Sequence, residues 1–168
     1  MTRRLARTAG TLGAVAALTL GLGGAVAHAQ PAGDTGTLAK LSHSAATSKF
    51  EAAGVTWSSS GGCSDRNTST CTSFDQINSE TVDGVITLKS ASGCAVTLTG
   101  GTETGHADGT YSHWNGYKVD VRLSDCLQSY ITGSFTSIGG SKWESASGNV
   151  YFREGNHWDI TYYNCGGC

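Results

Sequence analysis

Two short segments in the C-terminal third alternate apolar and polar residues with the period of a half-buried β-strand, and this alternation most constrains the fold. In residues 117–123 the odd positions are apolar, and in residues 157–163 the even positions are apolar. Because successive strand residues point to opposite faces, each segment predicts a strand with one face in the core and one polar face. The polar faces carry Lys118, Asp120, Arg122, His157, Asp159 and Thr161.

The rest of the chain alternates helix-like and strand-like patterns. Apolar residues recur at roughly helical spacing in residues 37–53 and again from Thr72 or Ser73 to Gly93, whereas residues 55–72 form a Ser/Gly/Asn-rich loop. Residues 94–99 alternate as a strand, residues 125–138 predict a short helix or loop, and residues 143–153 contain a further strand with a turn at 147–148. We therefore expect a small α+β domain whose antiparallel sheet is covered by helices on one side.

The N-terminus has the organisation of a secretory signal peptide. Arg3, Arg4 and Arg7 form a basic segment, residues 9–26 are apolar, and residues 27–29 read Ala-His-Ala, a cleavage-site pattern. Adjacent arginines also permit the twin-arginine export route. With no second apolar run to act as a membrane anchor, we expect the mature protein to be secreted to the cell exterior.

Removal of residues 1–29 leaves 139 residues, a length that suits one domain, with 30–36 as a flexible lead-in. Eight of the 11 basic residues and all 13 acidic residues remain, which gives a net charge of −5. Since no basic tract survives, nucleic acid and anionic membrane surfaces are excluded as partners. We expect a monomer.

All six cysteines lie in the exported part of the chain. An even number in an oxidising compartment predicts three disulfides. Cys63 and Cys71 flank a polar loop and are expected to pair locally, while the partners of the other four remain open. The alternative is a structural zinc site that uses the C-x-x-C pair at the C-terminus. The six are Cys63, Cys71, Cys94, Cys126, Cys165 and Cys168.

Two histidines and an aspartate can meet on the polar face of the sheet. Asp120 and His157 occupy strands that, if neighbours, place such residues about 5 Å apart, and His113 can fold back over Asp120 because Gly116 permits a sharp reversal. Three ligands with an open fourth position are typical of a catalytic zinc. Glu154, which we expect in the approach loop, can then serve as general base.

Other polar residues near these positions have two interpretations each. Asp159 shares a strand face with His157, so it either orients an imidazole or is an exposed strand acid. His106 is either a substrate-facing group or a turn residue. The whole set can also be read as ordinary polar residues of a Ser/Thr-rich sheet, but their combined spacing and strand phase favour the metal site.

The spacing also resembles a known signature. Ser112-His113-x-x-Gly116-x-x-x-Asp120 followed by Glu154-x-x-His157-x-Asp159 is similar to the zinc motif of the D-Ala-D-Ala metallopeptidase and hedgehog-like group. That group includes D,D-carboxypeptidases, dipeptidases and phage and murein endopeptidases, and residues 100–106 resemble its secreted and phage-associated members. The resemblance, over about residues 72–163, implies a hedgehog-like fold and one zinc per chain. It implies that His113, Asp120 and His157 are ligands and Glu154 the base.

One departure from the group bears on specificity. Many members carry an arginine after the strand that precedes the first ligand, where it binds the substrate carboxylate, but this chain has Thr102 and Glu103 there. The departure favours an endopeptidase over a carboxypeptidase or dipeptidase, with Lys118, Arg122 or Arg153 as substitute carboxylate contacts.

The resemblance therefore implies a secreted zinc peptidase that hydrolyses stem or cross-bridge peptides of peptidoglycan. Three alternatives remain open. They are a zinc-containing binding protein without catalysis, a zinc protease that acts on protein substrates, and a disulfide-stapled inhibitor or toxin-like scaffold whose histidines are incidental.

Overall fold

The computed structural model describes residues 39–163. The predicted signal peptide, the lead-in segment, Cys165 and Cys168 lie outside these residues. Within residues 39–163 no helix has the length and apolar character needed to cross a membrane.

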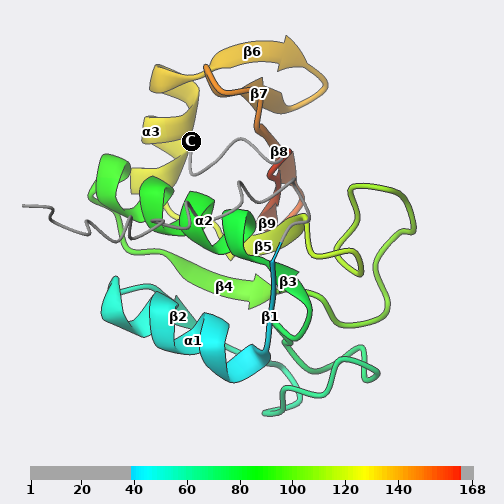
Figure 1. The fold of residues 1–168 in the computed structure, drawn as a ribbon. Coiled ribbons are helices and arrows are strands. Elements are labelled where there is room, and N and C mark those ends of the chain that lie inside the picture. Colours follow the sequence, from blue (N-terminus) through cyan, green and yellow to red (C-terminus); the bar gives the residue numbers. More distant parts are fainter. Residues whose placement is uncertain (1–38, 164–168) are drawn as a thin grey trace, which may run out of the picture. The chain divides into compact units, whose positions relative to one another are not determined.

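The described chain contains three helices and two sheets (Figure 1). The helices are α1 (His43–Ala52), α2 (Ser79–Ser92) and α3 (Asp125–Ser134). The strands are β1 (Lys40–Leu41), β2 (Thr56–Trp57), β3 (Ile77–Asn78), β4 (Thr97–Gly100), β5 (Lys118–Arg122), β6 (Thr136–Gly139), β7 (Lys142–Glu144), β8 (Val150–Glu154) and β9 (His157–Thr161).

The larger sheet has seven strands in the order β2-β4-β5-β9-β8-β7-β6, and β1 and β3 form a separate two-stranded sheet. All neighbours in the larger sheet are antiparallel except β2 and β4, which run parallel. The two alternating segments, β5 and β9, are direct neighbours near the middle of this sheet. The expected mixed α+β architecture is confirmed, with a predominantly antiparallel sheet.

The core lies between the helices and one face of the large sheet. Val119 and Val121 of β5 and Trp158 and Ile160 of β9 are fully buried, as the alternation predicts. They belong to one hydrophobic cluster with the apolar residues of α2 and α3, and Figure 1 shows α1 and α2 side by side along the sheet. The opposite face of β5 and β9 therefore remains for the polar residues.

The helix expected from Thr72 or Ser73 begins later, at Ser79. Two constraints prevent an earlier start: Gln76 adopts a left-handed conformation with φ of 65°, and Ile77 pairs with Leu41 of β1. The end of the helix was predicted correctly, since Gly93 is its left-handed C-terminal residue with φ of 65°.

Two further boundaries differ from the expectations. The strand predicted over 94–99 spans Thr97–Gly100, because Cys94 is tied by a disulfide to Cys126 at the start of α3. The segment 125–138 contains both α3 and most of β6, and residues 136–154 form a three-stranded meander (β6, β7 and β8) in place of one strand with a turn.

Two disulfides brace the described chain. Cys63 pairs with Cys71 across a sequence separation of 8, which confirms the local pairing. Cys94 pairs with Cys126 across a separation of 32, a connection that the sequence left open. The first closes the loop before β3, and the second joins the end of α2 to the start of α3.

Gly84 in α2 is required by packing, which yields a test of the core. A Cβ atom at this position would overlap the ring of the buried Tyr162. Replacement by alanine gains about 1 kcal/mol of helix propensity but overpacks the core at a cost of about 1–3 kcal/mol. We expect Gly84→Ala to lower the free energy of unfolding by up to about 2 kcal/mol, measured by denaturant titration.

Gly133→Ala in α3 is the matched control, since a Cβ atom there meets nothing within 4 Å. This variant should gain up to about 1 kcal/mol of stability. Equal stabilisation by both substitutions would contradict the packing of Tyr162 on Gly84.

Candidate metal centre

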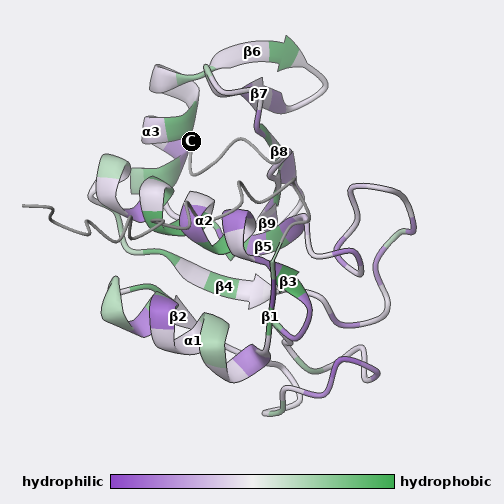
Figure 2. Ribbon diagram, viewed as in Figure 1, coloured by the Kyte–Doolittle hydropathy of each residue, from purple (hydrophilic) through white to green (hydrophobic). Residues whose placement is uncertain are grey.

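The polar face of β5 and β9 forms the floor of a pocket of about 300 Å³. The loop between β4 and β5 and the β8–β9 turn supply its other walls. In Figure 2 most of that loop is coloured as hydrophilic. The pocket is lined by Gly105, His106, Ala107, His113, Lys118, Asp120, Glu154, His157 and Asp159.

The register of β5 and β9 places Asp120 next to two ionisable groups. Asp120 lies directly opposite Asp159, and Arg122 lies opposite His157, so His157 is the diagonal neighbour of Asp120. Its side chain nevertheless reaches across, and its Nε2 lies 3.3 Å from Asp120 Oδ1. The structure thus brings Asp120 and His157 together, although the direct cross-strand neighbour of Asp120 is another carboxylate.

His113 approaches Asp120 from the loop before β5. Gly116 has φ of 78°, and its N–H donates to the His113 carbonyl at 2.8 Å, so the chain reverses there as expected. His113 Nδ1 lies 2.7 Å from the carbonyl oxygen of Gly101, and a carbonyl oxygen can only accept a hydrogen bond. Nδ1–H is therefore the donor, and Nε2 is directed to Asp120 Oδ1 at 3.3 Å.

Asp120 Oδ1 has the surroundings of a metal ligand. It is buried and accepts no well-aligned hydrogen bond in the described structure, yet two imidazole nitrogens lie 3.3 Å from it. Ligands about 2.0–2.1 Å from a tetrahedral zinc are separated by about 3.3–3.4 Å, so these two separations match the edges of such a site. Asp120 Oδ1 could therefore share a cation with either imidazole.

The Asp120 carboxylate also requires a glycine on the neighbouring strand. Gly100 is the Cα partner of Asp120 in β4. A Cβ atom on Gly100 would overlap Asp120 Oδ2 and lie only 2.9 Å from Asp120 Cγ. The absence of a side chain at residue 100 thus leaves the space that the carboxylate occupies.

His106 lies beside the same carboxylate in a different orientation. Its ring stacks on that of His113 with centroids 3.8 Å apart and an interplanar angle of 17°, and its Nδ1 is 3.9 Å from Asp120 Oδ2. His106, His113 and Asp120 are close enough to form a metal-binding group. Imidazole lone pairs lie in the ring plane, however, so two stacked rings cannot point at one ion unless one rotates. His157 offers a further imidazole nitrogen, 3.3 Å from Asp120 Oδ1.

Glu103 holds the loop that carries the histidines. Its buried carboxylate accepts hydrogen bonds from the backbone N–H groups of Ser73 at 2.7 Å and Gly101 at 3.1 Å, and it lies 3.2 Å from His106 Nε2. Burial alone would raise the pKa of Glu103, but the hydrogen bonds from His106, Ser73 and Gly101 outweigh it and lower the pKa. Sequence reasoning missed this role, because a single buried acid in a Gly/Thr-rich loop has no periodic signal.

The loop closed by the Cys63–Cys71 disulfide supports the same segment. The Arg66 guanidinium lies 3.7 Å from the centre of the Trp114 ring and donates to the Trp114 carbonyl, and its Nε donates to the Thr102 carbonyl at 3.2 Å. The N–H of Thr104 donates to the Arg66 carbonyl at 2.8 Å. The disulfide loop is therefore bonded to both ends of the loop that bears His106 and His113.

Glu154 does not lie in an approach loop, as we had expected. It is the last residue of β8 and the Cα partner of His157 across the two-residue turn at 155–156, so the two side chains share one face. Glu154 Oε2 lies 3.4 Å from His157 Nε2, and 52% of its side chain is exposed. In a two-residue hairpin, residues three positions apart lie opposite each other. This is why Glu154 lies beside His157 and not in a loop.

Asp159 is held by Lys118. The Lys118 ammonium donates to both carboxylate oxygens of Asp159, at 2.9 and 2.8 Å, and Asp159 Oδ2 is 3.9 Å from His113 Nε2. Burial would raise the pKa of Asp159, but hydrogen bonds and charge from His113 and Lys118 lower it to about 2. The charge of Lys118 is thus paired with Asp159, which weakens it as an anchor for a substrate carboxylate.

The carboxylates dominate the electrostatics of the pocket. Burial would lower the pKa of His113, but hydrogen bonds and charge from Asp120 and Asp159 raise it to about 9. The same negative groups would attract a metal cation to Nε2 in place of the proton.

The two arginines proposed as substrate contacts lie outside the pocket. Arg122 is exposed at the end of β5, and its guanidinium donates to Ser58 Oγ at 3.2 Å. Arg153 is the Cα partner of Trp158, so it lies on the sheet face opposite His157. Neither arginine is among the residues that line the pocket.

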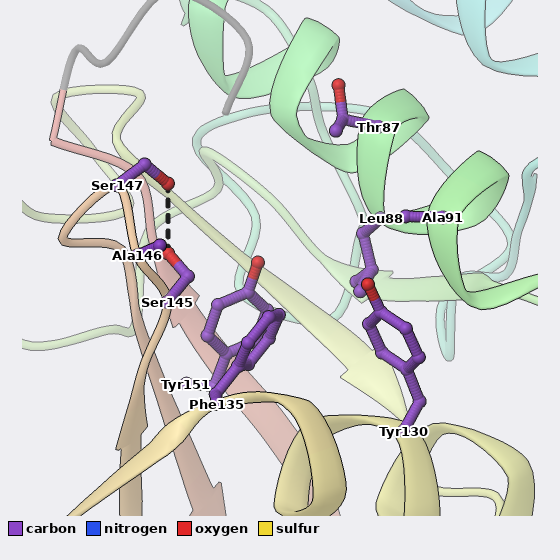
Figure 3. Close-up of a pocket in the computed structure, with 9 residues that line it drawn as sticks. All are labelled: Thr87, Leu88, Ala91, Tyr130, Phe135, Ser145, Ala146, Ser147 and Tyr151. Carbon is purple, nitrogen blue, oxygen red and sulfur yellow. Dashed lines mark hydrogen bonds between the residues drawn. The ribbon is translucent and has the colours of Figure 1, made fainter.

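A second pocket, of about 170 Å³, lies between α2, α3 and the turn that joins β7 to β8 (Figure 3). Leu88, Tyr130, Phe135 and Tyr151 form much of its wall, and Figure 3 shows the rings of Phe135 and Tyr151 side by side. No histidine, cysteine or carboxylate lines it. This second pocket therefore offers no usual metal ligand.

No protein-family model, curated protein or solved structure matches the chain. The similarity of residues 112–120 and 154–159 to a zinc signature consequently rests on those residues and on their geometry.

The tight packing of Gly100 on Asp120 yields a test of the metal centre. We expect the wild-type protein to bind about one zinc ion per chain, and Gly100→Ala to weaken that binding about 10–100-fold by displacing the carboxylate. Metal content after dialysis and competition with a chelating dye measure both quantities. His157→Ala should lose the ion, and Gly133→Ala should retain it. Wild-type affinity in Gly100→Ala would show that Asp120 is not a ligand.

Proposed function

We propose that the protein is a secreted zinc-dependent peptidase that hydrolyses peptide bonds in the stem or cross-bridge peptides of peptidoglycan. One observation carries the proposal: Asp120 Oδ1 is buried without a well-aligned hydrogen bond and lies 3.3 Å from Nε2 of both His113 and His157. The buried carboxylate needs a positive partner, and each imidazole nitrogen beside it can bring either a proton or a zinc ion.

The ligand set suits catalysis. His113, Asp120 and His157 would hold the ion, and two neutral imidazoles with one carboxylate would leave the site positively charged. When bound, a zinc ion would supply Lewis-acid activation of a water molecule and of the peptide carbonyl. The Gly101 carbonyl fixes the orientation of the His113 ring through Nδ1.

We propose Glu154 as the general base. Its carboxylate lies 3.4 Å from the same His157 nitrogen that faces Asp120, at the exposed rim of the pocket. It can accept a proton from a water molecule there and return it to the leaving amine of the substrate. Because the β8–β9 hairpin fixes the spacing of Glu154 and His157, base and ligand are positioned as one unit.

The pocket favours internal peptide bonds over a terminal one. Among the residues 39–163, the pocket is lined by one lysine, Lys118, and by no arginine. The Lys118 ammonium already donates to both oxygens of Asp159. Arg122 and Arg153 lie elsewhere. A substrate carboxylate would therefore meet a cation already paired with Asp159, whereas an internal peptide bond requires no such partner.

The setting of the site agrees with an extracellular enzyme. Two disulfides in the described chain fit an oxidising environment. Secretion is part of the proposal, supported by the signal-peptide pattern of residues 1–29. We infer the cell wall as substrate from the resemblance of the zinc motif to that of murein peptidases.

Replacement of Glu154 separates an enzyme from a zinc-containing binding protein. We expect Glu154→Gln to retain zinc but to lower the turnover of peptide substrate by about 10²–10⁴-fold, since the amide cannot accept the proton. Glu144→Gln, which alters an exposed strand glutamate of β7, is the matched control and should leave the rate unchanged. Zinc binding with equal rates in both variants would point to another base or to a binding protein.

Digestion of purified peptidoglycan tests the substrate and the bond. We expect mass analysis of the fragments to show cleavage within stem or cross-bridge peptides, and a zinc-stripped sample to release none. Release of free D-alanine alone would instead indicate a carboxypeptidase. Cleavage of protein substrates with untouched peptidoglycan would remove the cell-wall assignment.

A further inference from the structure

The ion pair between Lys118 and Asp159 lies in the metal pocket itself. Lys118 Nζ is 2.9 and 2.8 Å from the two carboxylate oxygens of Asp159, and the two side chains are only 26% and 13% exposed. Both residues line the pocket together with the three residues proposed as ligands. The pair is therefore shielded from bulk solvent and directed toward the site.

Asp159 is within reach of the ion that its neighbours would hold. It is the direct Cα partner of Asp120 on the same face of the sheet, and its Oδ2 lies 3.9 Å from His113 Nε2. Carboxylate oxygen is a normal zinc ligand. A small rotation of the Asp159 side chain toward His113 would offer a fourth ligand to the site.

A fourth protein ligand would change the character of the centre. Zinc sites with four protein ligands are structural, whereas catalytic sites keep one position for water or substrate. In this structure both oxygens of Asp159 accept from the Lys118 ammonium, which holds the carboxylate toward Lys118. Removal of that ammonium would leave a buried carboxylate without its cation, beside a metal that could replace it.

We infer that Lys118 is a positioning residue that holds Asp159 off the metal and so keeps the fourth coordination position open. This role rests on the proposed function, because it assigns the ion to His113, Asp120 and His157. It accounts for an otherwise unexplained feature of the pocket, a lysine that neutralises a second carboxylate beside the first. It also gives Asp159 a defined place outside the ligand set.

Cobalt substitution makes the open position visible without any peptide substrate. Azide binds at an open metal position and changes the visible absorption spectrum of a protein-bound Co²⁺ ion. We expect azide to change the spectrum of the wild-type Co²⁺ protein. Lys118→Met should weaken the azide response at least about ten-fold and tighten zinc binding, because Asp159 then closes the site. The double variant Lys118→Met/Asp159→Asn should recover the azide response.

Control variants separate this role from a loss of folding. Lys49→Met removes a Lys–Asp ion pair at the surface, between α1 and α2, and should behave as the wild type. Lys118→Gln keeps a hydrogen-bond donor toward Asp159, and it should show the same direction of change if Lys118→Met fails to fold.

The outcomes distinguish this inference from the proposed function. Co²⁺ bound with the same azide affinity in the wild type and the Lys118 variants would overturn the positioning role and leave the metal centre intact. Failure of the wild type to bind Co²⁺ or Zn²⁺ would overturn both. A closed site in Lys118→Met together with a wild type that cleaves no peptide would support the positioning role and remove the peptidase assignment.

Discussion

The rest of the site depends on the burial of one carboxylate in the middle of a sheet. Asp120 is only 7% exposed, and its strand neighbours Val119 and Val121 are fully buried on the opposite face. A charge in such a place needs compensation, because the free-energy cost of desolvation is large. Two imidazoles, His113 and His157, provide this compensation. Gly100 on the neighbouring strand leaves room for the carboxylate.

The scaffold around Asp120 is rigid because polar bonds cross between segments that are far apart in the sequence. Glu103 accepts hydrogen bonds from Ser73 and Gly101, Gly101 in turn fixes the His113 ring, and Arg66 bonds to the loop on both sides of the histidines. The Cys63–Cys71 disulfide closes the segment that carries Arg66. An irregular, Gly-rich loop can thus present imidazoles in a defined orientation, which the donors of a metal site require.

Features set by local interactions were predicted correctly from the sequence, whereas features set by contacts between distant residues were not. The strands over 118–122 and 157–161 and the end of α2 at Gly93 were predicted correctly, since alternation and left-handed glycine caps are local properties. The start of α2 was wrong, because the pairing of Ile77 with Leu41 overrides the helical spacing of residues 72–78. Glu154 was placed in a loop, although Gly155-Asn156 between two strand-like runs is a hairpin signal that sets Glu154 opposite His157.

The sequence by itself determined which residue types can do chemistry and on which strand face each lies, since strand periodicity assigns Asp120, His157 and Asp159 to a polar face. Only the tertiary structure decided which of these side chains meet. The β5–β9 register set Asp120 opposite Asp159, which the Lys118 ammonium contacts, and the β8–β9 register set Arg153 opposite Trp158, away from the pocket. Register and loop closure are set by the packing of the whole core, and a shift of one residue would exchange the two faces of a strand.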